Sequence, residues 1–195
     1  MLSFVQVLTS GIAIGCVYGL VALSFVLIYK ATAAVSFMQG EVLMVGGFTV
    51  LALNVGLGLP LLPAILCGVV LVAALGAGLE RSVLRRALGQ PHLTAVLLTF
   101  GLGLIMRGAV TTVPAASHGM HRLALPFGDE PLRLGALAIA PQHLLVIVAT
   151  VAVAGALSLF FRHTRAGLAL RACSENPQGA ALVGIPVAAM HTLAW

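Results

Sequence analysis

Long apolar runs separated by short polar segments dominate the chain. Four runs contain no Asp, Glu, Lys or Arg, namely residues 1–29, 42–79, 87–106 and 134–161. A helix crosses the hydrocarbon core of a bilayer with about 20 apolar residues, whereas a barrel strand needs about 10 in alternation. These runs are long and do not alternate. Because a helix satisfies its own backbone where water is absent, the pattern predicts transmembrane helices.

Polar residues and turn residues between the runs divide the chain into five predicted spans, at residues 4–28, 33–53, 61–79, 93–113 and 142–161. Polar residues interrupt the second span, and a Gly/Pro turn at 54–60 follows it. We expect a basic loop at 80–92 and a longer loop at 114–141, which contains four prolines. Residues 162–188 form a polar segment, and the chain turns apolar again at 189–195.

This succession predicts an all-α fold, a polytopic transmembrane helical bundle of about five spans plus the start of another. We expect residues 1–195 to form a single transmembrane domain that is truncated at its C-terminus, because the last apolar segment stops after one or two helical turns. The alternative is a short tail that Trp195 anchors at the membrane interface. The N-terminal apolar run lacks a basic n-region and is too long for a cleaved signal, so we interpret it as a retained span.

The distribution of Lys and Arg predicts the orientation of the spans. If the spans alternate in direction, one side of the membrane holds seven basic residues: Lys30, Arg81, Arg85, Arg86, Arg162, Arg165 and Arg171. The other side holds only Arg122 and Arg133, while Arg107 lies within the fourth span, near enough to its outer end to snorkel. Because cytoplasmic loops carry the excess of Lys and Arg, we place the N-terminus outside and residues 80–92 and 162–188 in the cytoplasm.

Composition supports a membrane protein and excludes other classes. Hydrophobic residues make up 61% of the chain and charged residues only 8%, against about 25% in a typical soluble domain. So few charges cannot cover a soluble protein, and the high hydrophobicity excludes disorder. The net charge of +5 comes from basic residues scattered between apolar runs, without the basic stripe typical of nucleic-acid binding. We therefore expect membrane lipid, and no nucleic acid, as a partner.

Three glycines recur at a regular interval in the first span. Gly11, Gly15 and Gly19 are four residues apart, which stacks them on roughly one face of a helix. Such a face lets another helix approach closely, so it predicts a helix-packing seam within a bundle. Ordinary glycine usage in membrane helices explains the pattern equally well. Both interpretations argue against a lone anchor helix.

The second span contains four candidate residues for a solute path: Ser36, Gln39, Gly40 and Glu41. A carboxylate in a lipid-facing helix costs roughly 2.5–3.5 kcal/mol, so Glu41 must face protein or a water-filled path, or lie near the membrane surface. Gly40 and the pair Gly46-Gly47 weaken the helix, and broken helices at membrane depth line cavities in transporters. Alternatively, the span begins only near Val42, and Glu41 is a first-turn acid at the cytoplasmic boundary.

The polar segment near the C-terminus carries the signals of a short helix. Asn176 is a favourable N-cap, and Pro177 suits the first helical position. Gly184 fits the position just after the helix, and Pro186 prevents its continuation. The spacing predicts a helix of about seven residues, which is too short to be stable alone in water. It is either a docking element for a cytoplasmic partner or a plain connector.

Histidines, cysteines and catalytic motifs contribute little. His118 and His121 share the predicted outer loop, but two ligands do not make a metal site. The three cysteines have no C-x-x-C spacing, so we expect no metal and no cofactor. A G-x-S-x-G motif and a phosphate-binding loop are both missing from the sequence. A membrane-embedded enzyme or haem-binding helical protein using interfacial histidines, such as His92 and His143, is the alternative function.

Three stretches together carry a resemblance to a known family. The first is the opening span, Gly11-Ile-Ala-Ile-Gly-Cys-Val-Tyr-Gly-Leu-Val-Ala-Leu. The second is Phe37-Met-Gln-Gly-Glu followed by Met44 and Gly46, where the family usually has Asn-Phe-Ala-His-Gly-Glu. This chain departs from that pattern at Ser36, Met38 and Gln39. The third runs from Arg165 to Ile185 and fits the family pattern R-A-x3-N-x3-A-x3-G-I without a gap.

These stretches resemble the membrane permease subunit of branched-chain amino acid ABC importers, a family that also includes urea and short-amide permeases. The resemblance covers nearly the whole chain, although family members are longer and contain further spans. It implies that residues 171–185 contain the coupling helix that sits in a groove of the cytoplasmic ATPase. The ATPase-coupling residues would then be Arg171, Glu175, Asn176, Ala180 and Gly184.

The resemblance also implies a function and partners. We expect a permease subunit that moves branched-chain amino acids or related small amides across the bacterial inner membrane by alternating access. Its partners would be two cytoplasmic ABC ATPase subunits, a second related permease or a second copy of itself, and a periplasmic solute-binding protein. ATP hydrolysis would belong to the ATPase subunits, so this chain would not itself be an enzyme. The sequence leaves the solute open.

Overall fold

The structure of this chain is a computed structural model, and it describes residues 2–32, 35–87, 90, 92–112, 132–134 and 137–195. Five of its helices are long and apolar enough to cross a membrane. In the apolar stretch of each of these helices, at most 17% of the residues are buried by the rest of the chain. The other residues remain accessible to lipid or to other proteins. The described part of the chain is therefore a multi-pass helical membrane protein.

The helices agree closely with the predicted spans. The elements are α1 (Leu2–Thr32), α2 (Gln39–Leu51) with the π-helical segment η1 (Ala52–Gly56), α3 (Leu61–Leu79) with the π-helical segment η2 (Glu80–Leu84), α4 (Arg85–Ala87), α5 (His92–Thr111), α7 (Pro141–His163), α8 (Arg165–Glu175), α9 (Pro177–Leu182) and α10 (Val187–Ala194). Helix α3 has the predicted bounds of the third span, but the helical span continues to Ala87. Hydrophobic patterning therefore locates the spans to within a few residues, except at the start of the second and the end of the third.

Two predicted loops are partly wrong. The basic loop expected at 80–92 is helical up to Ala87, because η2 and α4 continue α3 without interruption. The loop expected at 114–141 contains a short antiparallel hairpin, β1 (Leu132–Leu134) and β2 (Leu137–Ile139), in which Arg133 pairs with Ala138. In the sequence, large apolar residues alternate with other residues at 132–134 and 137–139, and Gly135-Ala136 separates the two runs. This pattern indicates a hairpin, but the prolines in the segment favoured a loop.

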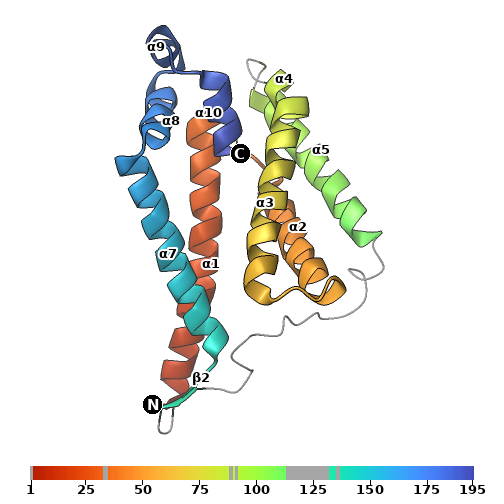
Figure 1. Ribbon diagram of the computed structural model, residues 1–195, viewed down its shortest axis with the longest axis vertical. Coiled ribbons are helices and arrows are strands. Elements are labelled where there is room, and N and C mark those ends of the chain that lie inside the picture. Colours follow the sequence, from red (N-terminus) through yellow and green to blue (C-terminus); the bar gives the residue numbers. More distant parts are fainter. Residues whose placement is uncertain (1, 33–34, 88–89, 91, 113–131, 135–136) are drawn as a thin grey trace.

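The helices form two groups (Figure 1). The α1 group consists of α1, α7, α8, α9 and α10, and the α3 group consists of α2, α3, α4 and α5 with the two π-helical segments. Within each group the long helices pack along one another, as α1 does with α7 and α2 does with α3 and α5. The contacts between the two groups are fewer, and they join α1 to α2 and α10 to η2.

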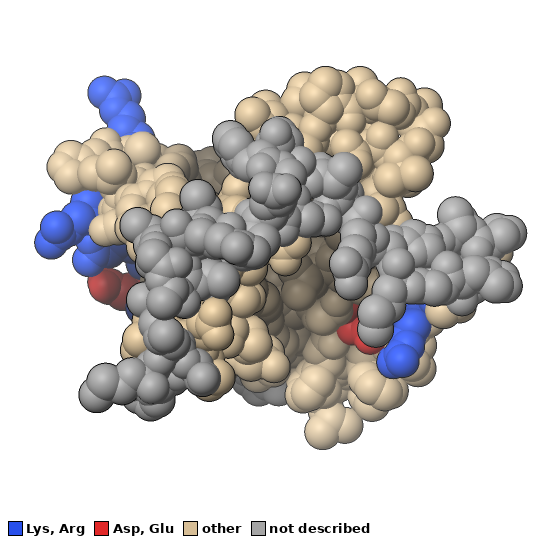
Figure 2. Space-filling view, turned by 90° about the horizontal axis from the view of Figure 1, so that it is seen from below, with Lys and Arg blue, Asp and Glu red and all other residues tan. Residues whose placement is uncertain are grey.

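Basic residues gather at one end of the bundle. Successive spans alternate in direction, and α9 lies at the end opposite the N-terminus (Figure 1). Lys30 and Arg162 lie in the last turns of α1 and α7, at the same end as η2, α4 and α8. Seen from the N-terminal end, the described surface is mostly uncharged, and the charged side chains in view lie at its margins (Figure 2). Arg122 lies outside the described residues. The arrangement agrees with the alternation on which the predicted orientation rests.

The joint between α7 and α8 is unusually close. The Thr164 hydroxyl accepts a 3.0 Å hydrogen bond from the Gly167 N–H and so caps α8. A Cβ on Gly167 would overlap the Phe160 carbonyl oxygen and lie 2.7 Å from the Phe161 Cα. These are backbone atoms of the preceding helix, which cannot move aside as a flexible side chain can. Glycine at 167 therefore sets the angle at which α8 leaves α7.

We expect Gly167→Ala to destabilise the protein by about 1–3 kcal/mol, the usual cost of overpacking a tight contact. Gly155→Ala is the matched control, because nothing lies within 4 Å of a Cβ at that helical position. Alanine there favours the helix by about 1 kcal/mol. Thermal unfolding of the purified protein in detergent measures both effects. A melting temperature for Gly167→Ala equal to that of the unchanged protein would contradict this account of the joint.

Candidate functional site

The short helix α9 is capped at both ends as the sequence predicts. At its start, the Asn176 Oδ1 accepts a 2.8 Å hydrogen bond from the Gly179 N–H. At its end, the Gly184 N–H donates to the Ala181 carbonyl and the Ile185 N–H donates to the Ala180 carbonyl, both at 3.0 Å. This pair of bonds is the Schellman motif, which requires a left-handed residue, and Gly184 has φ +84°. The caps replace hydrogen bonds that so short a helix cannot make internally.

The end of α9 presents an apolar tip. Leu182 is 89% exposed and Val183 is 77% exposed, whereas Ala180 on the opposite face is buried. Because α9 lies outside the five candidate spans, at the far end of the bundle from the N-terminus, lipid does not account for this exposure (Figure 1). Two neighbouring exposed aliphatic side chains on a rigid, capped helix are typical of a surface that another protein covers.

Arg171 and Glu175 belong to α8, and Glu175 directly precedes Asn176, the N-cap of α9. Both are exposed on α8, whose opposite face buries Cys173. Together with Lys30 of α1 they line a groove of about 750 Å³, whose other walls come mainly from α1, α7 and α10. Of the five predicted coupling residues, Asn176, Ala180 and Gly184 belong to α9 and its caps, whereas Arg171 and Glu175 line the groove.

The connector before α2 packs tightly against α5. Ser36 and Met38 are buried, and the Phe37 N–H donates a 3.2 Å hydrogen bond to the Thr99 hydroxyl. A Cβ on Gly103 would lie 3.4 Å from the Met38 Cα, so the missing side chain at 103 admits the connector. The polar backbone of a non-helical segment is thus covered by protein, as a membrane requires.

Glu41 is a first-turn acid, as one interpretation predicted, and it also faces protein at membrane depth, as the other predicted. Glu41 lies in the first turn of α2, which begins at Gln39 and runs through Gly46 and Gly47 without a break. The predicted interruptions at these glycines are therefore wrong, because the break lies in the connector. The Glu41 Cγ nevertheless lies 3.7 Å from the position of a Cβ on Gly103. Gly103 is eleven residues into α5, about 16 Å along a 30 Å helix, so this carboxylate lies near mid-span and faces protein.

The four candidate path residues have different surroundings. Gln39 lines a space of about 470 Å³ between α1, α2 and α3, whose walls are otherwise mostly apolar. Glu41 is half-buried and turns toward α5, and Gly40 is exposed. Ser36 lies in a separate small cavity. The start of α2 thus brings Gln39 and Glu41 to the same depth on different faces.

The glycine stripe of the first span has no neighbour within the described chain. Gly11, Gly15 and Gly19 are all exposed, and no described atom comes within 4 Å of a Cβ built on any of them. Close packing on this face would need a helix from outside the described residues. The predicted seam therefore stays a prediction.

A buried ion pair at the end of α3 escaped the sequence analysis. Glu80 is 1% exposed, and its carboxylate accepts two 3.3 Å hydrogen bonds from the Arg85 guanidinium. The Thr192 hydroxyl of α10 donates to the Glu80 Oε2 at 2.7 Å. The charged residues at 80–86 predicted a loop, and a spacing of five residues between Glu80 and Arg85 does not indicate a pair on an α-helix.

A water-sized cavity lies beside this ion pair. Its volume is about 20 Å³, and its lining includes Ser36, Glu80, Thr99 and His191. Among the described side chains, the buried Ser36 hydroxyl and both ring nitrogens of His191 have no hydrogen-bond partner. A cavity of this size with several polar groups has room for one water molecule.

The geometry does not favour the alternative function with paired histidine ligands. His92 begins α5 at the end of the bundle that carries α9, whereas His143 lies in the first turn of α7 at the opposite end (Figure 1). Side chains at opposite ends of the spans cannot bind one haem. His118 and His121 lie outside the described residues.

Comparisons with known proteins support one family. The chain is 28% identical to the "High-affinity branched-chain amino acid transport system permease protein BraD" of Pseudomonas aeruginosa over 194 residues, which is 93% of this chain and 62% of that protein. It is 27% identical to the permease protein LivH of Escherichia coli K12 over 199 residues, 94% of this chain and 63% of that protein. The LivH protein of Salmonella typhimurium is 28% identical with the same coverage.

The chain thus spans less than two thirds of the length of these curated relatives, which are transport permease proteins rather than enzymes. No solved structure matches the chain significantly. The model of one protein family, described as "Branched-chain amino acid transport system / permease component", matches residues 7–195. Five apolar helices and a capped helix at the basic end agree with that match, and the chain therefore belongs to this permease family.

Proposed function

We propose that this chain is the permease subunit of an ABC importer that moves branched-chain amino acids or related small amides across the bacterial inner membrane. Its partners are two cytoplasmic ATPase subunits, a second related permease or a second copy of this chain, and a periplasmic solute-binding protein. The family match and the relatives named as branched-chain amino acid permeases support this assignment. The N-terminus lies outside and α9 lies in the cytoplasm, as the excess of basic residues at the α9 end favours.

The observation that carries the proposal is the capped helix α9 with its exposed Leu182 and Val183. This helix docks in a groove of the ATPase subunit. When ATP closes the ATPase pair, α9 moves with the groove and tilts the spans, so that the path opens to the other side of the membrane. ATP needs to favour one of two packings by only a few kcal/mol to produce this change.

The path runs between the spans near the start of α2. The mostly apolar walls of the space beside Gln39 suit the aliphatic side chain of a branched-chain amino acid. Glu41 lies at the same depth on another face of α2, turned toward α5, where its carboxylate suits the ammonium group of a solute that passes this level of the membrane. A carboxylate at this depth is costly, which is typical of functional positions in membrane proteins.

We expect a cysteine at Leu182 to crosslink to an ATPase subunit in the assembled full-length complex. Val148→Cys is the matched control, because Val148 is also an exposed aliphatic residue, 66% exposed, but lies within the span α7. Burial raises the pKa of the native Cys173 thiol, so its reactive thiolate is scarce at neutral pH and it adds little background. Crosslinks from Leu182→Cys to no ATPase subunit, or its labelling from the periplasmic side, would exclude the proposed docking.

We expect Gly184→Val to reduce solute uptake and Gly184→Asn to preserve most of it. A β-branched residue at φ +84° costs about 1–2 kcal/mol, which shifts a conformational equilibrium roughly tenfold away from the docked shape of α9. Asparagine tolerates the left-handed conformation, so it controls for the loss of glycine itself. Uptake and ATP hydrolysis are measured together in proteoliposomes. Normal uptake per ATP in Gly184→Val would show that the end of α9 does not matter for coupling.

We expect Glu41→Gln to lower leucine uptake by about tenfold, since a hydrogen bond to a charged group contributes roughly 1.5–3 kcal/mol. Thr49→Val on the same helix is the control, because the Thr49 hydroxyl only donates to the Val45 carbonyl. Urea carries no ammonium group, so uptake of urea in place of leucine by the unchanged complex would correct the solute class. Unaltered leucine uptake in Glu41→Gln would remove Glu41 from the path.

A further inference from the structure

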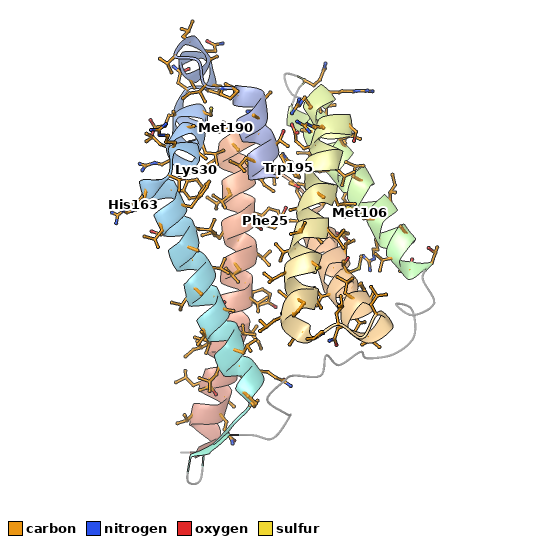
Figure 3. All side chains as sticks on the ribbon, in the orientation of Figure 1. Phe25, Lys30, Met106, His163, Met190 and Trp195 are labelled. Carbon is orange, nitrogen blue, oxygen red and sulfur yellow. The ribbon has the colours of Figure 1, made fainter. Side chains whose placement is uncertain are left out.

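Two groups of helices share few contacts, and one of these contacts involves the segment that follows α9. The α1 group contains α8, α9 and α10, whereas α3 and its extension η2 belong to the α3 group. Helix α10 begins at Val187, five residues after the end of α9. It lies between the two groups, as the labelled residues Met190 and Trp195 show (Figure 3). A displacement of α9 therefore reaches α10 through a very short connection.

The contact between α10 and η2 is polar and specific. Glu80, Arg85 and Thr192, which we call the Glu80 cluster, are joined by hydrogen bonds across the two groups. The Arg85 Nη2 donates to the Thr192 hydroxyl at 2.8 Å and to the Ala188 carbonyl at 3.3 Å, and the Thr192 hydroxyl donates to the Glu80 carboxylate at 2.7 Å. The Thr192 hydroxyl also lies 3.1 Å from the Ala188 carbonyl of its own helix, but its one proton favours the shorter contact with Glu80. Thr192 thus accepts from Arg85 and donates to Glu80, which joins the ion pair to α10.

The π-helical geometry of η2 creates the ion pair. On an α-helix, neighbouring side chains on the surface are three or four residues apart, so residues five apart do not face each other. In η2 (Glu80–Leu84), the backbone hydrogen bonds join residues five apart instead of four, so the turn is wider and Arg85 lies over Glu80. Single π-turns within α-helices are rare and are frequent at functional sites.

The Glu80 carboxylate cannot be left without these partners. It is 1% exposed, and a buried charge is costly unless it is paired and hydrogen-bonded. Arg85, at 37% exposure, reaches the carboxylate from the solvent side. On the other side lies the water-sized cavity, where Ser36 and His191 make no hydrogen bond to another described residue. The direct polar link between α10 and η2 is therefore supplied by the Glu80 cluster.

We propose that Glu80, Arg85 and Thr192 are positioning residues that transmit the displacement of α9 from the α1 group to the α3 group. The inference rests on the proposed docking of α9 to an ATPase subunit. When α9 tilts, α10 moves with it, and the bonds from Thr192 and Ala188 carry η2 and therefore α3. Without them, α10 slides past η2, and ATP hydrolysis no longer moves the wall formed by α2 and α3.

The test compares Thr192→Val with Thr192→Ser in the full-length protein, assembled with its ATPase subunits and binding protein in proteoliposomes. Valine keeps the shape but removes the hydroxyl, and serine restores it. Thr150→Val on α7 is the matched control, because the Thr150 hydroxyl donates only to the Val146 carbonyl of its own helix. The quantity measured is the amount of leucine taken up per ATP hydrolysed.

We expect Thr192→Val to lower uptake per ATP by about tenfold, within the range of typical coupling between sites. Thr192→Ser and Thr150→Val should keep the ratio of the unchanged complex. If Thr192→Val does not accumulate in the membrane, Arg85→Lys replaces it, since lysine keeps the charge but cannot donate as a planar fork. The same tenfold loss is expected for Arg85→Lys.

Three outcomes would overturn the inference. An unchanged ratio in Thr192→Val, or a parallel loss of uptake and hydrolysis that leaves the ratio unchanged, would show that the cluster only stabilises the fold. A loss that Thr192→Ser does not restore would show that the hydroxyl is not the cause.

The crosslink from Leu182→Cys, repeated in the Thr192→Val background, separates the two proposals. Its presence with an unchanged ratio contradicts only the role of the Glu80 cluster, whereas its absence in the unchanged complex contradicts the docking of α9 and this inference together.

Discussion

The absence of water inside a bilayer is the constraint on which this structure depends. Each span must satisfy its own backbone, so the chain crosses as helices, and each charge at depth needs a protein partner. Glu80, which is buried at the end of α3, has Arg85 and Thr192 as partners. Glu41 meets the requirement by lying in the first turn of α2, where the helix dipole favours an acid, against α5 rather than lipid. Each carboxylate lies where two helices that are distant in the sequence meet: α2 and α5 for Glu41, and η2 and α10 for Glu80.

Local contacts fix two joints near the C-terminal part of the chain. Helix α9 is fixed by Asn176 at one end and by the Schellman motif at the other. The close joint at Gly167 fixes α8 to α7 in the same way. By contrast, the α1 and α3 groups are packed internally but meet at few places. A chain of this kind suits rocking of one group against the other, because small cores that are individually well packed move as bodies.

Much of the fold was predictable because its signals are local. The spans follow from uncharged runs, and α9 follows from Asn176, Pro177 and Gly184, whose capping chemistry acts within a few residues. The Glu80 ion pair was not predictable in this way. Its two residues are five apart, a spacing that has no meaning on an α-helix, and its third member is 112 residues distant from Glu80. The hairpin at 132–139 was missed because a proline-rich context outweighed a short alternation.

Apolar patterning and capping residues by themselves determined the class of protein, the five candidate spans of the described residues and the position of α9. Burial in lipid and helix capping depend on neighbouring residues, so both can be inferred from the sequence. Packing alone decided where the second span begins and what its first turn faces. Gly103 admits the connector and places Glu41 near mid-span, although nothing adjacent to Glu41 in sequence indicates α5. Likewise, only the meeting of α10 with η2 joins Thr192 to Glu80, because contacts between distant segments depend on the shape of the whole bundle.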